Sequence, residues 1–217
     1  MNPQLAAMVE KAKKASVPKA VIDGAIARGQ GRSPTGGVLE SMTLEFVMPP
    51  STALIVDLET ENKIRVLQEI NLMVKKAKGT TGSSKFFFTR TGRVKFEKSD
   101  KEIGIDEIMD DAIEAGAEDL ETDADGNLII WTEPSKTTQV TKAIGDKFGL
   151  NVLGSGIIWS ANEGTKTKLA SSDDLTNLVD LLSQLREYPD VRAVYSNASK
   201  GDISNEEWES VEEHLDI

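Results

Sequence analysis

The chain has 217 residues, of which 39% are hydrophobic, and its 36 acidic and 25 basic side chains give a formal net charge of −11. The absence of cysteine excludes disulfides, thiolate catalysis and cysteine-ligated zinc, and no apolar stretch approaches the roughly 20 residues of a membrane-spanning helix, so we expect no membrane insertion. The acidic average argues against nucleic acid as a partner, but residues 1–37 carry +4, residues 38–101 carry +3 and the remainder carries −18, which predicts a basic face and an acidic body.

The first 37 residues predict a helical domain followed by a linker. Residues 3–15 and 18–28 both place apolar side chains at helical spacing, with Ser16 as the expected cap of the second helix and Gly29 as its end. Residues 29–37 are rich in Gly, Ser, Pro and Arg and contain no large apolar residue, which is typical of a linker.

Beyond Met42 the apolar residues alternate, which is the period of a strand. Residues 43–48 and 52–59 predict two strands joined by a Pro-Pro-Ser turn, and residues 61–78 predict a helix. We expect the buried side of this helix to contain its large apolar residues, Ile64, Leu67, Ile70, Leu72 and Val74.

Residues 86–98 predict a β-hairpin, because two runs of strand composition flank a Thr91-Gly92 turn. Strand alternation places Phe86 and Phe88 on the same side. We therefore favour a core role for both rings over stacking against nucleic-acid bases.

Residues 102–170 have an αββαβ pattern of their own and predict an inserted domain. The expected helices lie near residues 105–115 and 135–148, and the expected strands near residues 118–123, 127–132 and 150–160. Asp125-Gly126 is a strong hairpin signal, and Gly116 is placed to end the first of these helices in a left-handed conformation.

The last part of the chain predicts a helix, a strand and an acidic tail. Ser172 caps an expected helix that runs to Arg186, and residues 191–195 predict a strand. The tail predicts a helix from Asn205, with Trp208, Val211 and Leu215 as its docking stripe. The order of elements predicts an α+β fold with an N-terminal helical hairpin over residues 1–37, a split ferredoxin-like α/β domain over residues 38–101 and 171–217, and the inserted αββαβ domain over residues 102–170.

Motifs for catalysis, metals and cofactors are weak. The single histidine, His214, lies among acidic residues near the C-terminus, which is typical of a solvated side chain rather than a general base. Residues 123–127 imitate the first half of a calcium loop, but Leu128 and Pro134 stand where that loop needs Gly and Glu. The Gly-Ser-Gly run at 154–156 lacks the third glycine of a dinucleotide site and favours a bulge or kink. We expect a non-enzymatic protein without a metal or cofactor.

Basic side chains instead gather around a loop of small residues. Lys75, Lys76 and Lys78 close a predicted helix, residues 79–84 are rich in Gly, Ser and Thr, and more basic residues follow. Cations neutralise phosphates and small residues let backbone amides approach them, so the pattern suits a phosphate backbone. Lysines at a helix C-terminus also stabilise the helix dipole, and that structural interpretation stays open. The candidate nucleic-acid-binding residues are Lys11, Lys13, Lys14, Arg28, Arg32, Lys63, Arg65, Lys75, Lys76, Lys78, Lys85, Arg90, Arg93 and Lys95.

Four stretches carry a resemblance to a known family. They are Asn2–Leu5 before a Lys-rich helix, Lys19–Gly31 (KAVIDGAIARGQG), Phe86–Lys98 (FFFTRTGRVKFEK) and Ala112–Asp119 (AIEAGAED). The chain resembles, along nearly its whole length, the YebC-like bacterial regulators, whose mitochondrial branch comprises the translational activators of cytochrome c oxidase subunit one. The family normally opens with a Gly-His-Ser-Lys-Trp arm and a further basic helix, so we expect that part of this basic region is missing here. The Pro-Pro turn at residues 49–50 is similar to the fungal mitochondrial branch.

The resemblance implies a non-enzymatic translational activator that binds ribosomal RNA or mRNA on the ribosome, in the mitochondrial matrix or, if the chain is bacterial, in the cytoplasm. In this family the N-terminal helical region and the neighbouring basic face are thought to contact RNA. Bacterial members are also described as DNA-binding transcriptional regulators, which keeps DNA as an alternative partner. A further alternative, from charge alone, is a protein-interaction adaptor whose working surface is the acidic body, residues 102–217.

Overall fold

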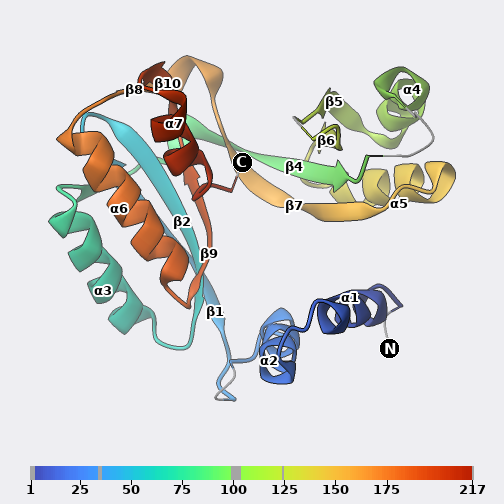
Figure 1. The fold of residues 1–217 in the computed structure, drawn as a ribbon, viewed down its shortest axis with the longest axis horizontal. Coiled ribbons are helices and arrows are strands. Elements are labelled where there is room, and N and C mark those ends of the chain that lie inside the picture. Colours follow the sequence, from blue (N-terminus) through green and yellow to red (C-terminus); the bar gives the residue numbers. More distant parts are fainter. Residues whose placement is uncertain (1–2, 34–35, 99–103, 124, 217) are drawn as a thin grey trace.

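The structure is a computed structural model that describes residues 3–33, 36–98, 104–123 and 125–216. Within these residues seven α-helices and ten β-strands form a mixed α+β fold, as predicted. The strands make two four-stranded sheets and one two-stranded sheet. Figure 1 shows two N-terminal helices, a first sheet backed by helices, and a second sheet that extends away from the first.

The N-terminal helical hairpin consists of α1 (Pro3–Lys14) and α2 (Lys19–Gly29), as the helical spacing predicted. An apolar cavity of about 450 Å³ is lined by both helices. The prediction that Ser16 caps α2 is wrong, because Pro18 precedes this helix. Ser16 has a φ of 58° and its N–H donates to Lys13 O at 3.0 Å, so it closes the first helix instead of opening the second.

The first sheet and its helices are β1 (Glu40–Met48), β2 (Thr52–Thr60), α3 (Lys63–Lys76), β3 (Thr80–Thr81), α6 (Asp173–Glu187), β9 (Val191–Ser196) and α7 (Asn205–Glu212). The strand order is β3-β1-β2-β9 and all pairs are antiparallel. The predicted pair of strands around the Pro-Pro-Ser turn is confirmed, with Met48 opposite Thr52. Apolar residues of α3, α6 and α7 share one core with β1, β2 and β9, so the three helices cover one face of this sheet.

The two C-terminal helices agree with their predicted caps and stripes. The Ser172 hydroxyl accepts from Leu175 N at 3.4 Å at the start of α6. On α7 and just beyond it, Val211 and Leu215 are buried and Trp208 packs against the same core. The acidic tail is therefore docked on the first sheet by its apolar side.

The buried side predicted for helix α3 is confirmed for Ile70 and Val74 and wrong for Ile64, Leu67 and Leu72. Its buried residues are Val66, Ile70 and Val74, which are spaced by four and form one stripe. Ile64 and Leu72 are 72% and 55% exposed. The prediction left out Val66 and included Ile64 and Leu72, which point away from the Val66 stripe at roughly 100° per residue.

The second sheet has the order β5-β6-β4-β7. Its elements are β4 (Phe88–Phe96), α4 (Ile105–Ala115), β5 (Ala117–Thr122), β6 (Leu128–Thr132), α5 (Thr137–Phe148) and β7 (Val152–Ala161). The helices cover one face, where Ile108 and Ile144 meet Val94 and Phe96. The helices and strands expected between residues 105 and 161 are present, and Gly116 has the expected left-handed φ of 106°.

The predicted hairpin between residues 86 and 98 is wrong, because β4 is one continuous strand. Gly92 lies in its middle, paired with Thr132 of β6 and with Ile157 of β7. A Cβ on Gly92 would lie 2.0 Å from Thr137 Oγ1 and 2.3 Å from Thr132 Oγ1. The glycine is thus required by a close approach inside the second sheet, and not by a turn.

Three short strands were not predicted. One is β3 at the edge of the first sheet. The other two are β8 (Thr167–Ala170) and β10 (Ala198–Asp202), which pair in parallel as a separate two-stranded sheet. The split ferredoxin-like arrangement and the three-domain division stay predictions. In the part of the chain that the structure describes, no helix is long and apolar enough to span a bilayer.

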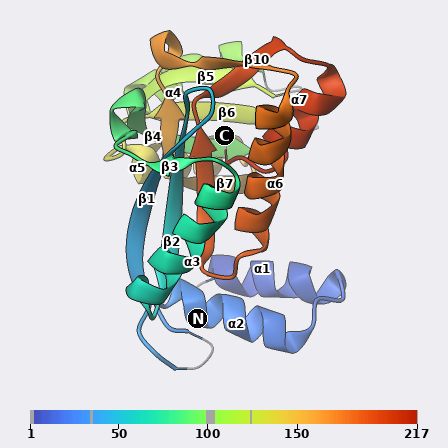
Figure 2. The same ribbon diagram turned by 90° about the vertical axis from the view of Figure 1, so that its left-hand side faces the viewer.

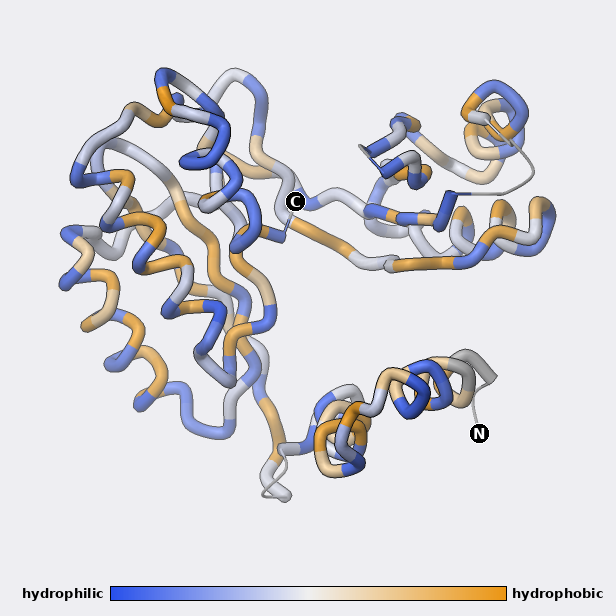
Figure 3. Tube along the Cα trace, in the orientation of Figure 1, coloured by the Kyte–Doolittle hydropathy of each residue, from blue (hydrophilic) through white to orange (hydrophobic). Residues whose placement is uncertain are grey.

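Hydropathy along the backbone follows this architecture. In Figure 3 apolar positions run along the strands of the first sheet and along the helix sides that face them, while polar positions mark the outer helix sides. The basic residues therefore lie on the outside of a conventional core.

Candidate nucleic-acid interface

The fourteen candidate basic residues fall into three groups along the chain. Five lie on the helical hairpin, in the last turn of α1, at the end of α2 and just beyond it, namely Lys11, Lys13, Lys14, Arg28 and Arg32. Two lie in the first turn of α3, and seven lie between Lys75 and Lys95. We call residues 75–95 the cationic segment.

The two basic residues in the first turn of α3 are held by carboxylates. Lys63 Nζ lies 2.5 Å from Glu40 Oε2, and Arg65 Nη2 lies 3.6 Å from Asp190 Oδ2. The helix spans residues Lys63–Lys76 and rises about 21 Å, so this pair is distant from the lysines at its other end. Lys63 and Arg65 are therefore not brought together with the cationic segment.

The cationic segment carries seven basic side chains and no carboxylate. Five of them are exposed and the last two are half-buried; the set is Lys75, Lys76, Lys78, Lys85, Arg90, Arg93 and Lys95. Among the described residues, carboxylates reach ion-pair distance of Lys85 and Lys95 alone in this set. Positive charge without a compensating partner is therefore concentrated here.

The segment starts at the C-terminal end of α3, where the helix dipole favours positive charge. The chain then turns tightly, because Lys78 has a φ of 63° and a Cβ on Gly79 would lie 2.3 Å from Met48 Sδ. Next, β3 pairs with β1 at the edge of the first sheet. Figure 2 shows α3 leading into β3 at this edge, so the segment passes from the helix-covered face toward the opposite face.

The turn after β3 is the 3₁₀ helix η1 (Lys85–Phe87), and β1 anchors it. Glu45 Oε2 accepts from the N–H groups of Ser84 at 2.7 Å and Lys85 at 2.9 Å, and Lys85 Nζ lies 3.2 Å from Glu45 Oε1. The buried Ser84 hydroxyl donates to Leu54 O at 3.1 Å. Burial raises the pKa of Glu45, but these hydrogen bonds outweigh it and hold the pKa below its ordinary value of 4.5. The turn is therefore fixed by a charged carboxylate.

Two aromatic rings and two cations lie at this turn, and we call Lys85, Phe86, Arg90 and Trp159 the turn platform. Phe86 is 65% exposed. Arg90 Cζ lies 4.7 Å and Lys85 Nζ lies 6.0 Å from the centre of the Trp159 ring. Cation–π attraction therefore holds both charges at the Trp159 ring, and Lys85 directly precedes the exposed Phe86 in the chain.

The predicted core role is confirmed for Phe88 and wrong for Phe86. Phe88 is 6% exposed and packs with Ile55 and Tyr195. Phe86 belongs to the 3₁₀ turn, where side chains do not alternate as they do in a strand, so its ring stays on the surface. Sequence reasoning missed the turn platform because it assumed a strand; the available signal was a run of three aromatic residues beside a lysine.

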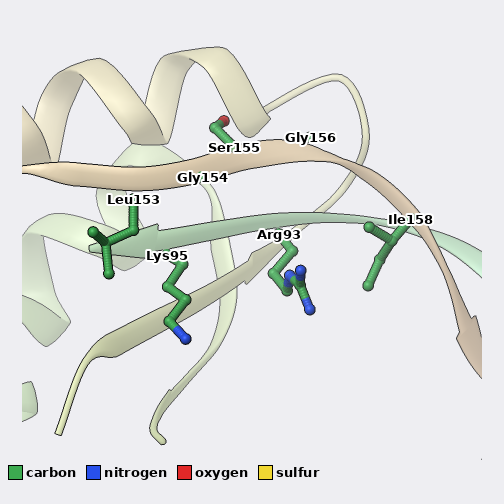
Figure 4. Close-up of a pocket in the computed structure, with 7 residues that line it drawn as sticks. All are labelled: Arg93, Lys95, Leu153, Gly154, Ser155, Gly156 and Ile158. Carbon is green, nitrogen blue, oxygen red and sulfur yellow. The ribbon is translucent and has the colours of Figure 1, made fainter. Parts of the chain in front are cut away.

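The far half of the β4–β7 pair forms a second cationic feature, the strand patch: Arg93, Lys95, Gly154 and Gly156. Arg93 is opposite Gly156 and Lys95 is opposite Gly154, and a Cβ on either glycine would meet nothing within 4 Å. These residues line a shallow cavity of about 450 Å³, and Figure 4 shows Arg93 and Lys95 pointing to the same side of the strands. The backbone beside the two cations is therefore uncovered. The expected bulge is confirmed, because the register shifts next to Gly154.

One of the two cations in the strand patch is already paired. Lys95 Nζ lies 2.7 Å from Asp123 Oδ2, and this bond, with those from Asn127, lowers the pKa of Asp123. No carboxylate of the described residues lies within ion-pair distance of Arg93. Arg93 is therefore the cation of the strand patch that can accept an anion without giving up an acidic partner.

The side chains gathered in the cationic segment have the chemistry of a binding surface. His214 is half-buried, and its Nδ1 lies 2.9 Å from Ser210 O on α7. Within the described ranges, no group of three or more His, Asp or Glu side chains is placed to hold a metal ion. Exposed cations, an exposed ring and uncovered backbone are the features that bind phosphates and bases.

Comparison with known proteins places the chain among relatives over most of its length. The family described as "TACO1/YebC second and third domain" matches residues 39–198, and the family described as "TACO1/YebC protein N-terminal domain" matches residues 1–32. The two matches therefore include the helical hairpin and both four-stranded sheets.

Individual relatives agree with this result. The chain is 35% identical over 200 residues to a protein of Nitrosococcus oceani and 33% identical over 208 residues to one of Rubrobacter xylanophilus, both named "Probable transcriptional regulatory protein". These alignments cover 91% and 94% of this chain and 77% and 79% of the relatives. The crystal structure of a conserved hypothetical protein, Aq1575 from Aquifex aeolicus, aligns with a TM-score of 0.70 and 28% identity, over 94% of this chain and 82% of that one.

Proposed function

The chain belongs to the TACO1/YebC family, and on that premise we propose that it is a non-enzymatic regulator of gene expression that binds nucleic acid through its cationic segment. The observation that carries the proposal is the run of seven basic side chains without a carboxylate between Lys75 and Lys95, in a chain of net charge −11. Such a contrast attracts a polyanion to the basic region, while the acidic residues 102–217 repel it. The names of the relatives support a regulatory role.

Two versions of this function differ in the nucleic acid. The names of the relatives favour a transcriptional regulator that binds duplex DNA. The exposed ring of Phe86, on the same turn as the cation Lys85, favours RNA, which proteins recognise through unstacked bases. In the RNA version the protein is a ribosome-associated translational activator, and a mitochondrial setting belongs to that version.

Charge reversal at the end of α3 tests the site. Seven engaged phosphates predict that the logarithm of the association constant for single strands falls with the logarithm of salt at a slope of about −5. The triple variant Lys75→Glu, Lys76→Glu and Lys78→Glu removes three cations, so its slope is expected near −3. Fluorescence anisotropy with a labelled RNA strand, measured over a salt series, gives both slopes.

A matched control reverses Lys136, Lys142 and Lys168, which are exposed and lie outside the cationic segment. This variant has the same net charge as the first but should keep the wild-type slope. Equal weakening by the two triple variants would show that binding follows net charge and not this site. Wild-type binding that ignores salt would contradict the proposed function as a whole.

The nucleic acid itself is identified by competition. Labelled RNA bound to the full chain is challenged with unlabelled duplex DNA and, separately, with purified ribosomes. Displacement by ribosomes at lower nucleotide concentration supports the translational version, and displacement by duplex DNA supports the transcriptional one. Co-sedimentation with ribosomes and cell fractionation then test the partner and the compartment.

A further inference from the structure

The exposed ring of Phe86 stands on a turn that is unusually well fixed. The N–H groups of Ser84 and Lys85 both donate to Glu45, and the Asn162 side chain donates to Phe86 O at 3.3 Å. The backbone N–H of Asn162 also donates to Phe87 O at 2.9 Å. A ring on such a turn loses little freedom when it contacts a ligand, because its backbone is already ordered.

The charges beside the ring are also ordered before any ligand arrives. Trp159 is half-buried and packs in the cluster that contains Phe88 and Tyr195. Arg90 stacks on this fixed indole at 4.7 Å, and Lys85 reaches over the same ring while pairing with Glu45. Trp159 thus positions two cations on residues that precede and follow Phe86 in the chain, and the Phe86 ring is 65% exposed although it contacts Phe87.

We propose that the turn platform holds an unpaired base, with Phe86 stacked on the base and Lys85 and Arg90 bound to the adjoining phosphates. This inference rests on the proposed function and specifies its ligand as a single-stranded stretch of nucleic acid. In a duplex, neighbouring base pairs cover both faces of each base, so an exposed ring on a rigid turn finds no free face. An apolar ring alone suits many partners, but a ring flanked by cations fits the alternation of base and phosphate in one strand.

The ligand class is tested with four fluorescein-labelled probes of equal length: an RNA strand, the DNA strand of the same sequence, an abasic strand that keeps the phosphates, and the RNA annealed to its complement. The proteins are the full chain and its Phe86→Ala, Phe86→Trp and Ile113→Ala variants. Ile113 is 58% exposed on α4, so its truncation removes a comparably exposed apolar side chain away from the turn platform.

Loss of one stacked base is expected to raise the Kd of Phe86→Ala for the RNA or DNA single strand about 5- to 150-fold. The salt slope should stay unchanged, since no phosphate contact is removed. Phe86→Trp should bind within about twofold of the wild type, because the larger ring also stacks. On the abasic strand and on the duplex, Phe86→Ala and wild type should bind alike, and Ile113→Ala should match wild type throughout.

The stacking role is overturned if Phe86→Ala binds the single strands as tightly as wild type does. It is also overturned if Phe86→Ala loses as much affinity for the abasic strand as for the intact strands. Both results leave the proposed function intact. A wild type that prefers the duplex and a Phe86→Ala variant that binds like it would also overturn the stacking role, and this result would favour the transcriptional version. Wild type that binds none of the four probes would overturn both proposals. A larger loss for the RNA strand than for the DNA strand would support stacking and assign RNA as the ligand.

Discussion

Gly92 allows the assignment of β4 as one continuous strand to be tested by a single methyl group. In Gly92→Ala the new Cβ would lie 2.0 Å from Thr137 Oγ1 and 2.3 Å from Thr132 Oγ1, and these two hydroxyls are themselves hydrogen-bonded at 3.1 Å. Overpacking of a filled core costs about 1–3 kcal/mol, and loss of the buried hydroxyl pair adds about 0.5–1.5 kcal/mol. We therefore expect the free energy of unfolding to fall by roughly 2–4 kcal/mol.

The matched control is Gly154→Ala on the neighbouring strand β7, where a Cβ meets nothing within 4 Å. Alanine is favoured over glycine inside a strand by about 0.5–1 kcal/mol, so this variant should be neutral or slightly stabilised. Urea unfolding followed by tryptophan fluorescence measures both, and the expected loss moves the midpoint of Gly92→Ala down by about 1–2 M. If the two variants unfold at the same urea concentration, Gly92 is not crowded, and that result would favour the hairpin turn at residues 91–92 over a continuous strand.

Three further predictions concern groups that the fold fixes. Glu45→Gln should lower the free energy of unfolding by about 1.5–3 kcal/mol at neutral pH, because it weakens charge-assisted hydrogen bonds. The pKa of Glu45 is lowered in the folded state, so the stabilisation by this carboxylate is complete above pH 4.5 and is lost as the pH falls through the folded pKa. Wild type and variant should therefore converge in acid denaturation. Burial raises the pKa of both Tyr188 and Tyr195 to about 12, so the absorbance of phenolate should be absent at pH 10. A tyrosine that is half-titrated at pH 10 would contradict the burial of these two side chains. Asn197→Ala should lower the free energy of unfolding by about 2–5 kcal/mol, because the 1% exposed side-chain amide accepts from Ala53 N of β2 at 2.8 Å and donates to Thr165 O at 2.7 Å. The control Asn151→Ala, at an exposed position, should lower it by under about 1 kcal/mol in the same unfolding assay.

Periodicity was sufficient to find most of the long elements. The strands around the Pro-Pro-Ser turn, the helices near residues 105–115 and 172–186, and the helix of the acidic tail all lie where spacing and caps placed them. These elements each bury one regular face, so the sequence period and the packing agree. The two strands β8 and β10 were missed because they are short and pair only with each other.

The candidate site was predicted in part. Lys75–Lys95 was found from composition, but the positions of Phe86 and Gly92 depend on contacts with residues far along the chain. Asn162 fixes the turn that exposes Phe86, and Thr132 and Thr137 crowd Gly92. A single sequence does not reveal such long-range partners, so an aromatic was assigned to the core and a strand glycine to a turn.

The chain leaves the first sheet through β4 and returns to it from β7 at one point, where Phe87 O accepts the Asn162 N–H at 2.9 Å. Between these two residues lies the second sheet, which extends away from the first in Figure 1. The two sheets also share buried side chains at this point, because Phe88 and Ile158 pack with Ala53, Ile55 and Tyr195. A homologue could therefore lengthen or trim the outer part of the second sheet, but an exchange of the whole sheet must keep the residues of this shared cluster, next to the turn that displays Phe86.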